Sequence, residues 1–258
     1  MPEGDTIARA AIRLDRALTG RTLTRVEIRR ATRVPAVGVR VLAVESIGKH
    51  LMIRFDDGNT LHTHMQMSGE WHVMRSGEKW RKPGHAARVV LVTDDGSEAV
   101  CFDAPVVQVG PTRRERDWVG HLGPDLCRAD ADLDAAVRRF EELDPGTELG
   151  VALLDQRVAC GVGNVYKSDV CFVVGVDPFT PVSAVDAAMR RALIETAARL
   201  LQANLGNARR VTFAGGLAVY GRAGRPCRRC GTLVLSRRQG EQARTTYWCP
   251  TCQPHPTS

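Results

Sequence analysis

Residues 227–252 read CRRCGTLVLSRRQGEQARTTYWCPTC. The two Cys-x2-Cys pairs, Cys227/Cys230 and Cys249/Cys252, have the spacing of a four-cysteine zinc ribbon, in which each pair directs two thiolates at one tetrahedral ion. The segment between them reads as two strands joined by the polar turn RRQGEQ. We expect a β-hairpin that closes on one Zn²⁺. The ion is structural because four protein ligands leave no open position for water. Two disulfides or four free thiols are the alternatives.

The charge of the chain is concentrated around this hairpin. The net charge of the 258 residues is +7, and the stretch from Asn207 to Arg244 holds a single acid, Glu241. No lysine lies in the stretch, and guanidinium groups bind phosphate in a bidentate way. This pattern favours nucleic acid as the partner over a solvated basic surface. The arginines are Arg209, Arg210, Arg222, Arg225, Arg228, Arg229, Arg237, Arg238 and Arg244.

Composition excludes several classes of protein. Hydrophobic residues make up 43% and charged residues 25% of the chain, as in soluble globular proteins. No apolar run is long enough to span a membrane, and the N-terminus lacks the features of a signal peptide. We therefore expect a cytoplasmic protein with reduced cysteines and no membrane partner. The four cysteines outside the pairs have apolar neighbours and are expected to pack as small hydrophobes: Cys101, Cys127, Cys160 and Cys171.

The chain begins MPEGDTIARA. A proline in second place normally permits removal of the initiator methionine, and the new chain end, Pro2, is then a secondary amine. Apolar residues from Ile7 to Leu18 recur at spacings of three and four, which predicts a helix with Asp5 as its N-cap and Gly20 as its stop. Pro2 and Glu3 would thus lie just ahead of a helix packed on a core. Pro2 is either a processing signal alone or a nucleophile.

From about residue 22 to residue 110 the sequence shows short β-type runs separated by turns such as DDGN and DDGS, typical of an antiparallel sandwich. Past residue 125 the pattern is helical, with helices over DADLDAAVRRFEEL, ELGVALLDQRV, NVYKSDVCFVVG and SAVDAAMRRALIETAARLLQANL. The fold class is α+β. We expect an N-terminal helix and β-sandwich in residues 1–125, a helical domain in 126–215 and the zinc hairpin in 216–258.

The segment CGVGN joins two of the expected helices. Glycines at 161 and 163 would allow positive φ, with Asn164 as the N-cap of the second helix. The amides of such a turn can bind a phosphate without selecting a base. A tight turn with no ligand is the alternative.

These pieces, in this order, resemble the formamidopyrimidine-DNA glycosylase/endonuclease VIII family over the whole chain. The resemblance is carried by PEG (2–4), IGKHLMIRF (47–55), HMQMSG (64–69), LLDQRVACGVGNVYKSDVCF (153–172), VYGRAGRPCRRCG (219–231) and ARTTYWCPTCQ (243–253). MPEG and YWCPTCQ look like the endonuclease VIII branch, whereas HMQMSG and VYGRAGRPC look more like the formamidopyrimidine branch. The chain is most like an endonuclease VIII, with a helix–two-turn–helix motif and a four-cysteine zinc hairpin.

The resemblance implies a bifunctional DNA glycosylase and abasic-site lyase of base excision repair. Pro2 would form a Schiff base with the sugar and drive β,δ-elimination, with Glu3 as general acid–base and Lys49 as a further catalytic residue at the departing base or a phosphate. It also implies damaged DNA as the partner of a monomeric, nucleoid-associated protein. The DNA-binding residues would be Gln66, Met67, Gly163, Asn164 and Arg244, with Met67 filling the space left by the extruded nucleotide.

Two positions depart from the family pattern. Thr6 and Asp169 stand where glutamate is common, which affects the placement of Glu3 and the lesion pocket. Oxidised pyrimidines are the preferred substrates expected, with oxidised purines or abasic sites as alternatives. A non-catalytic zinc-ribbon protein that binds damaged DNA is an alternative of another class. His62 and His64, two apart on one strand face, are interpreted as structural.

Overall fold

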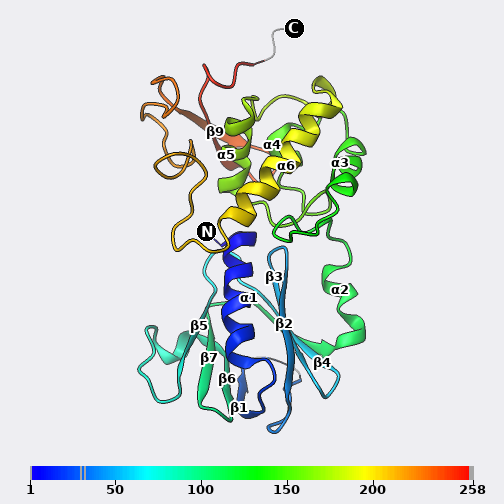
Figure 1. Ribbon diagram of the computed structural model, residues 1–258, viewed down its shortest axis with the longest axis vertical. Coiled ribbons are helices and arrows are strands. Elements are labelled where there is room, and N and C mark those ends of the chain that lie inside the picture. The colour runs from blue at the N-terminus through cyan, green and yellow to red at the C-terminus, as the bar shows by residue number, and fades with distance from the viewer. Residues whose placement is uncertain (1, 30, 32, 256–258) are drawn as a thin grey trace. The chain divides into compact units, whose positions relative to one another are not determined.

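The computed structural model describes residues 2–29, 31 and 33–255, and its chain divides into two compact units, Met1–His121 and Leu122–Ser258 (Figure 1). The expected α+β class is confirmed. In the first unit one long helix accompanies two antiparallel sheets, and the second unit combines helices with a β-hairpin. The domain boundaries expected after residues 125 and 215 stay predictions.

Helix α1 (Gly4–Leu18) leads the first unit, shown in dark blue in Figure 1. Its buried face follows the predicted spacing of apolar residues. The helix ends as expected ahead of Gly20, whose φ of +81° is the left-handed conformation that commonly terminates helices. The face that packs on the sheets consists of Ile7, Ala10, Ala11, Leu14 and Leu18.

Two four-stranded antiparallel sheets form the rest of this unit. One has the order β1–β6–β7–β5, with bounds Leu23–Ile28, Ala87–Thr93, Ser97–Phe102 and Glu70–Arg75. The other has the order β2–β3–β4–β8, with bounds Val41–Ile47, His50–Phe55, Asn59–His64 and Val106–Pro111. Strand β8 was missed from the sequence because VVQVGP lacks a clear alternation and ends in proline. A short helical turn, η1 (Gly84–Ala86), lies between β5 and β6, and two more, η2 (Thr112–Arg114) and α2 (Arg116–Val119), follow β8.

One apolar core joins α1 to both sheets. Leu23 from one sheet and Leu51 and Phe55 from the other are at most 1% exposed, and all belong to the same buried cluster as Leu14 of α1. The side chain of Trp71 lies in this core and satisfies its indole N–H by donating to Thr63 Oγ1 at 3.1 Å. The core fixes the first turn of α1, and with it the position of the chain's beginning.

The second unit contains α3 (Leu133–Glu141), α4 (Leu149–Ala152), α5 (Asn164–Val174), η3 (Val182–Ala184) and α6 (Ala187–Ala203). Asp132 caps α3 by accepting from the amide of Ala135 at 2.8 Å, as its sequence predicted. The prediction of a helix over the whole of ELGVALLDQRV was wrong in its length. The helix is the single turn α4, because the chain bends again at once towards the glycine turn at 161.

A two-stranded hairpin, β9 (Leu235–Gln239) and β10 (Arg244–Trp248), completes this unit. The turn is shorter than the predicted RRQGEQ: Arg237, Arg238 and Gln239 belong to β9, and residues 240–243 connect the strands. Gln239 extends the strand because its side chain is buried, which the polar sequence did not indicate. In the part of the chain that the structure describes, no helix is long and apolar enough to cross a membrane.

Candidate active site and metal centre

The start of the chain is held by the first turn of α1. Glu3 is the N-cap residue in place of the expected Asp5, and its carbonyl accepts from the amides of Thr6 at 2.9 Å and Ile7 at 3.1 Å. Its side chain is fully buried. Asp5 is instead a buried first-turn residue that pairs with Arg9 at 3.6 Å. Glu3 therefore presents a fixed carboxyl group directly beside Pro2.

Pro2 lies on the wall of a cavity of about 700 Å³ in the first unit. Thr6 lines this cavity from α1, and Met65 and Met67 line it from the connection between β4 and β5. A cavity of this size is typical of a ligand-binding site. The secondary amine that processing would create is thus placed at an accessible cavity with a buried carboxyl group as its neighbour.

Met67 lies in a tight turn and not in a strand. The turn is closed by the amide of Gly69, which donates to Met65 O at 2.8 Å. A Cβ at residue 69 would lie 2.8 Å from Met65 Cα and 3.0 Å from Ala104 Cα, so glycine is required there. Gln66 has a φ of +45°, and the Met67 side chain is 63% exposed. Met67 is therefore not a half-buried strand residue: an apolar side chain projects from a rigid turn.

Lys49 occupies the two-residue turn between β2 and β3, and Gly48 provides the positive φ that the turn needs. The neighbouring strands bring a histidine cluster to the same end of this sheet. His50 and His62 stack with ring centroids 5.0 Å apart, and their Nδ1 and Nε2 atoms are 2.8 Å apart. His64 packs edge-on against His50. The sequence indicated the pairing of 62 with 64 but did not predict that His50 joins them.

This cluster is uncharged at neutral pH. Burial, with the nearby His62 and His64, lowers the pKa of His50 to about 3. Burial also lowers the pKa of His62 to about 4, against the opposing hydrogen bond with Gln108. For His64 the pKa is lowered by burial and by the charge of Lys49. Lys49 is thus the cation at this end of the sheet, beside neutral imidazoles.

In the second unit, the glycine turn leads into α5. Gly161 has a φ of +107°, as predicted, but Gly163 is extended, with a φ of −124°, and is itself the N-cap. Asn164 is therefore the first helical residue and not the expected cap. Its Nδ2 donates to the carbonyl of Thr245 at 2.9 Å, and its Oδ1 is buried without a hydrogen-bond partner in the described chain.

Arg244, the neighbour of Thr245, begins strand β10. Its Nε donates to Gln242 Oε1 at 3.0 Å, and no carboxylate of the described residues pairs with it. Several other arginines of the basic stretch are already engaged. Arg237 stacks on Phe179 at 3.5 Å and Arg229 on Phe172 at 4.4 Å from the ring centroids. The nine arginines are thus not equivalent, and part of the set holds the hairpin.

A buried polar chain ties the hairpin to the helices. Lys167 is fully buried and donates to Thr246 Oγ1 at 2.5 Å, and Thr246 donates to Gln239 Oε1 at 2.6 Å. Gln239 Nε2 in turn donates to Glu148 Oε2 at 2.9 Å and to Pro178 O at 2.8 Å. These bonds fix β10, and therefore Arg244, against α4 and α5. Sequence reasoning missed this set, because each of these residues looked surface-exposed by type.

Asp169 organises the loop that follows α6. Its carboxylate is fully buried and accepts from Thr212 Oγ1 and from the amides of Ala218, Val219 and Tyr220. Burial raises the pKa of Asp169, and the four donors oppose that shift. The side chain of Asp169 is one methylene shorter than the glutamate that is common at this position in the family. The structure shows that aspartate reaches all four donors.

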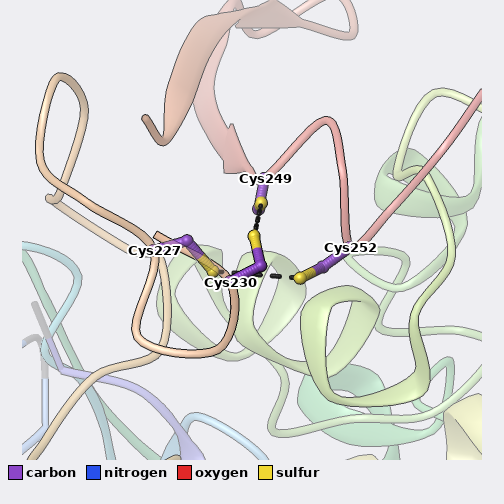
Figure 2. A group of neighbouring side chains, drawn as sticks. All are labelled: Cys227, Cys230, Cys249 and Cys252. Atoms are coloured by element: carbon purple, nitrogen blue, oxygen red, sulfur yellow. Dashed lines mark hydrogen bonds between the residues drawn. The ribbon is translucent and has the colours of Figure 1, made fainter. Parts of the chain in front are cut away.

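The four cysteines of the two pairs lie together, as the spacing predicted (Figure 2). Their sulfur atoms are all within 4.8 Å of one another, with Cys230 to Cys249 at 3.5 Å and Cys227 to Cys252 at 3.9 Å. These distances exclude a disulfide, whose sulfurs are about 2.05 Å apart. A tetrahedral zinc ion with bonds of about 2.3 Å separates its sulfurs by about 3.8 Å, so the cluster fits zinc.

Before a cation binds, Cys230 and Cys252 differ in acidity. Hydrogen bonds from Thr232 lower the pKa of Cys230 to about 6, whereas burial raises the pKa of Cys252 to about 12. A divalent cation deprotonates coordinating thiols, so the set becomes uniform only when it is occupied. The cysteines outside the cluster behave as expected: Cys101, Cys127, Cys160 and Cys171 are buried.

The comparisons with known proteins agree with this geometry. A family model described as the formamidopyrimidine-DNA glycosylase N-terminal domain matches residues 1–105, and one described as the formamidopyrimidine-DNA glycosylase H2TH domain matches residues 122–213. The chain belongs to the formamidopyrimidine-DNA glycosylase/endonuclease VIII family. Within this family it resembles the endonuclease VIII-like members, including some that are 41–47% identical to it. A probable endonuclease 8 2 of Streptomyces coelicolor is 47% identical, over 99% of this chain and 95% of that protein.

Other members of the family extend the comparison. A protein of Mycolicibacterium smegmatis, described as DNA-(apurinic or apyrimidinic site) lyase Nei2, is 41% identical over 98% of this chain and 99% of its own. Solved structures show the same fold at lower identity. A MutM bound to DNA that contains carbocyclic 8-oxo-G has a TM-score of 0.82 and 18% identity, and covers 98% of this chain and 100% of that chain. The Lactococcus lactis glycosylase bound to abasic-site DNA gives the same values.

Proposed function

We propose that this member of the family is a bifunctional DNA glycosylase and abasic-site lyase of base excision repair, with Pro2 as its nucleophile. The observation that carries the proposal is the position of Pro2, which lies on the cavity wall and directly precedes the buried carboxyl group of Glu3. An α-amino group has a reference pKa of about 8, so an appreciable fraction is unprotonated at neutral pH. Relatives described as endonuclease 8 and as an abasic-site lyase support this reaction class.

The reaction follows from the chemistry of a secondary amine. Pro2 N attacks C1′ of the damaged nucleotide, and the C1′–N bond to the base breaks with its electron pair leaving on the base. Pro2 N gives up its one N–H proton, and the C1′–O4′ bond then breaks with a proton delivered to O4′, which opens the sugar ring. The resulting iminium has no N–H to lose, so it stays cationic and acidifies the C2′ protons. Loss of a C2′ proton expels the 3′ phosphate, and a second elimination expels the 5′ phosphate. Glu3 is the general acid–base that moves the protons.

The remaining residues hold the DNA. Lys49 supplies a cation at its turn for a phosphate or for the departing base. In the second unit, Asn164 and Arg244 bind the phosphates of the damaged strand, together with the amides of the glycine turn at Gly163. The exposed Met67, with Gln66 beside it, fills the space that the extruded nucleotide leaves in the stack.

Zinc is the cation that the cysteine cluster would hold, as a structural ion. When bound by Cys227, Cys230, Cys249 and Cys252, it fixes the base of the hairpin and supplies no reactive position. The protein is proposed to act as a monomer on damaged DNA in the cytoplasm. Oxidised pyrimidines are the proposed preferred lesions, and oxidised purines or abasic sites are alternatives. The support for the first is the likeness to proteins described as endonuclease 8.

The test is borohydride trapping on an abasic-site oligonucleotide, with intact-protein mass spectrometry to establish that Met1 is absent. The expected result is a covalent adduct that maps to Pro2. A matched protein with one serine retained ahead of Pro2 converts the proline nitrogen into an amide, and it should bind DNA without forming an adduct at Pro2. If methionine-free protein binds DNA and forms no adduct, the chain is a binding protein without the chemistry.

Substrate choice needs a separate measurement. Excision rates are compared on duplexes that contain thymine glycol, 8-oxoguanine or a preformed abasic site. Faster release of thymine glycol supports the pyrimidine preference. If the protein cleaves the abasic site and releases neither damaged base, it is a lyase without glycosylase activity.

A further inference from the structure

The cavity that begins at Pro2 continues away from it as a groove. One wall is α1, where Thr6, Ala10 and Arg13 line it, and the opposite wall includes Trp71 and Val73 of strand β5. At a rise of about 1.5 Å per residue, Thr6 and Arg13 are about 10 Å apart along the helix. The groove therefore extends well past the space that one nucleotide at Pro2 requires.

Three cations line the groove: Arg13 of α1, and Lys79 and Arg81 of the loop between β5 and β6. Among the residues that the structure describes, none of the three has an ion pair or a side-chain hydrogen bond. Burial and the neighbouring charge of Arg9 lower the pKa of Arg13, so this guanidinium is partly desolvated without an anion to compensate it. Unpaired, partly desolvated cations favour an anionic ligand.

The acidic residues of the groove do not cancel this charge. Glu70 is engaged by Lys82, whose Nζ is 2.6 Å from Oε1, and by His72 at 3.1 Å. These contacts lower the pKa of Glu70, with burial opposing them. Glu78 is the other carboxylate on the wall and is exposed. This one carboxylate does not neutralise three cations, so the net charge of this part of the groove is positive.

The loop that carries Lys79 and Arg81 is anchored. Trp80, between them, donates its indole N–H to Glu98 Oε1 at 2.6 Å and packs edge-on against Phe102, with ring centroids 5.6 Å apart. Lys82 is held by Asp103 at 2.9 Å as well as by Glu70. Two neighbours of the free cations are thus fixed to the sheet, so that Lys79 and Arg81 are preorganised at the groove.

We propose that this groove is a second DNA subsite, which binds about three unpaired nucleotides of the damaged strand next to the one at Pro2. The proposal rests on the proposed function, since the occupant is continuous with the nucleotide that Pro2 attacks. The three cations that line the groove can neutralise up to three phosphates of one continuous strand. The polar backbone would lie along Arg13, Lys79 and Arg81.

The test measures binding by fluorescence anisotropy to tetrahydrofuran-containing DNA of three kinds. One is a full duplex, and the other two lack three nucleotides of the opposite strand on the 5′ or the 3′ side of the lesion analogue. We expect tighter binding to one of the gapped forms. The variant Lys79→Ala/Arg81→Ala should remove that advantage. For the gapped form, the slope of log affinity against log salt concentration should become shallower by about 1.4. Each phosphate contact of a single strand contributes about 0.7 to this slope, and the variant removes two contacts.

With this change in slope, the ratio of wild-type to variant affinity should change by about sevenfold between 50 and 200 mM salt. The matched control is Arg113→Ala/Arg116→Ala, which removes two exposed cations of the same unit that do not line the groove. Glu78→Gln should strengthen binding to the gapped form. Equal losses on gapped and full duplexes in both double variants would overturn the proposal, as would displacement of the gapped DNA by polyglutamate at equal charge concentration.

Failure of this inference is distinguishable from failure of the proposed function. Borohydride trapping of the wild-type protein reports on Pro2 with the full duplex alone. Trapping without a gap-dependent advantage removes the subsite and leaves the lyase. A gap-dependent advantage without trapping keeps the groove as a strand-binding site and removes the chemistry.

Discussion

Asn164 donates a hydrogen bond from Nδ2 to the carbonyl oxygen of Thr245, at 2.9 Å, and so joins the start of α5 to the start of β10. Residues 81 positions apart are thereby adjacent, and Arg244 is the next residue along the strand. The two groups proposed to bind phosphate belong to one rigid arrangement inside the second unit. Their spacing does not depend on flexible side chains alone.

The first prediction concerns Asn164→Asp. The substitution removes the donor to Thr245 and places a carboxylate where a phosphate is proposed to bind, so DNA affinity should fall at least about tenfold, or about 1.4 kcal/mol. Anisotropy titrations with and without a lesion analogue measure it, and both should weaken. Asn59→Asp, at the start of β4 in the other unit, adds the same charge and should change binding much less. Equal effects of the two variants would show that only net charge matters.

The second prediction concerns the metal. Purified protein should contain one zinc ion per chain by elemental analysis, and a strong chelator should remove it together with DNA binding. Cys249→Ser should do the same, because three remaining thiolates bind zinc more weakly and the base of the hairpin loosens. Cys171→Ala removes a buried thiol outside the cluster and should keep the metal. DNA binding that persists in metal-free protein would contradict the role given to the ion.

The third prediction is a dependence of stability on pH. His50 and His62 stay neutral in the folded chain until pH reaches about 3 and about 4, whereas unfolded histidine takes up a proton near pH 6.5. Protons are therefore bound preferentially by the unfolded state below pH 6.5, and stability falls as pH decreases from there towards about 4. Each histidine contributes at most about 1.4 kcal/mol per pH unit in this window.

Urea unfolding at pH 7 and pH 4.5 measures this effect. His62→Asn should reduce the difference between the two pH values, whereas His85→Asn, which alters an exposed residue, should leave it intact. A difference that is unchanged by His62→Asn would mean that other groups dominate the acid lability.

The fourth prediction concerns Asp169→Asn. An amide offers one acceptor oxygen in place of two, and its NH₂ group faces donors, so several of the four hydrogen bonds are lost. Bonds to a charged acceptor contribute about 1.5–3 kcal/mol each. Hydrogen exchange at Val219 and Tyr220 should accelerate by more than tenfold, and excision should slow while binding of undamaged DNA remains. Unchanged exchange at these amides would show that the loop is held by other contacts.

Structures that depend on regular spacing within a short segment were predictable from the sequence. The apolar spacing in α1, the strand runs between residues 22 and 102 and the spacing of the four cysteines each encode local geometry, and each is confirmed. The N-cap assignments at Asp5 and Asn164 were wrong for a physical reason. A polar residue at a helix start satisfies a capping pattern. Here the side chain of Asp5 pairs with Arg9 within the same helix, and the side chain of Asn164 makes a tertiary contact with Thr245.

Contacts between distant segments were not predictable. His50 joins the other two histidines only because β3 and β4 pair in a register that places it directly opposite His64 and diagonal to His62. Likewise, the burial of Lys167 depends on Thr246 from a hairpin 79 residues later. The site residues Pro2, Glu3, Lys49, Asn164 and Arg244 came from the family resemblance, and their roles stay predictions.

Gly150 and Gln239 constrain each other through simple geometry. A Cβ at residue 150 would lie 2.3 Å from Gln239 Oε1, so any larger residue at 150 would displace the amide that anchors the hairpin to α4. A family member with a side chain at position 150 should also carry another residue at 239, and a different contact should then hold its hairpin on α4. Sequence covariation between these two positions is therefore the evolutionary trace expected of a hairpin whose docking includes a buried glutamine.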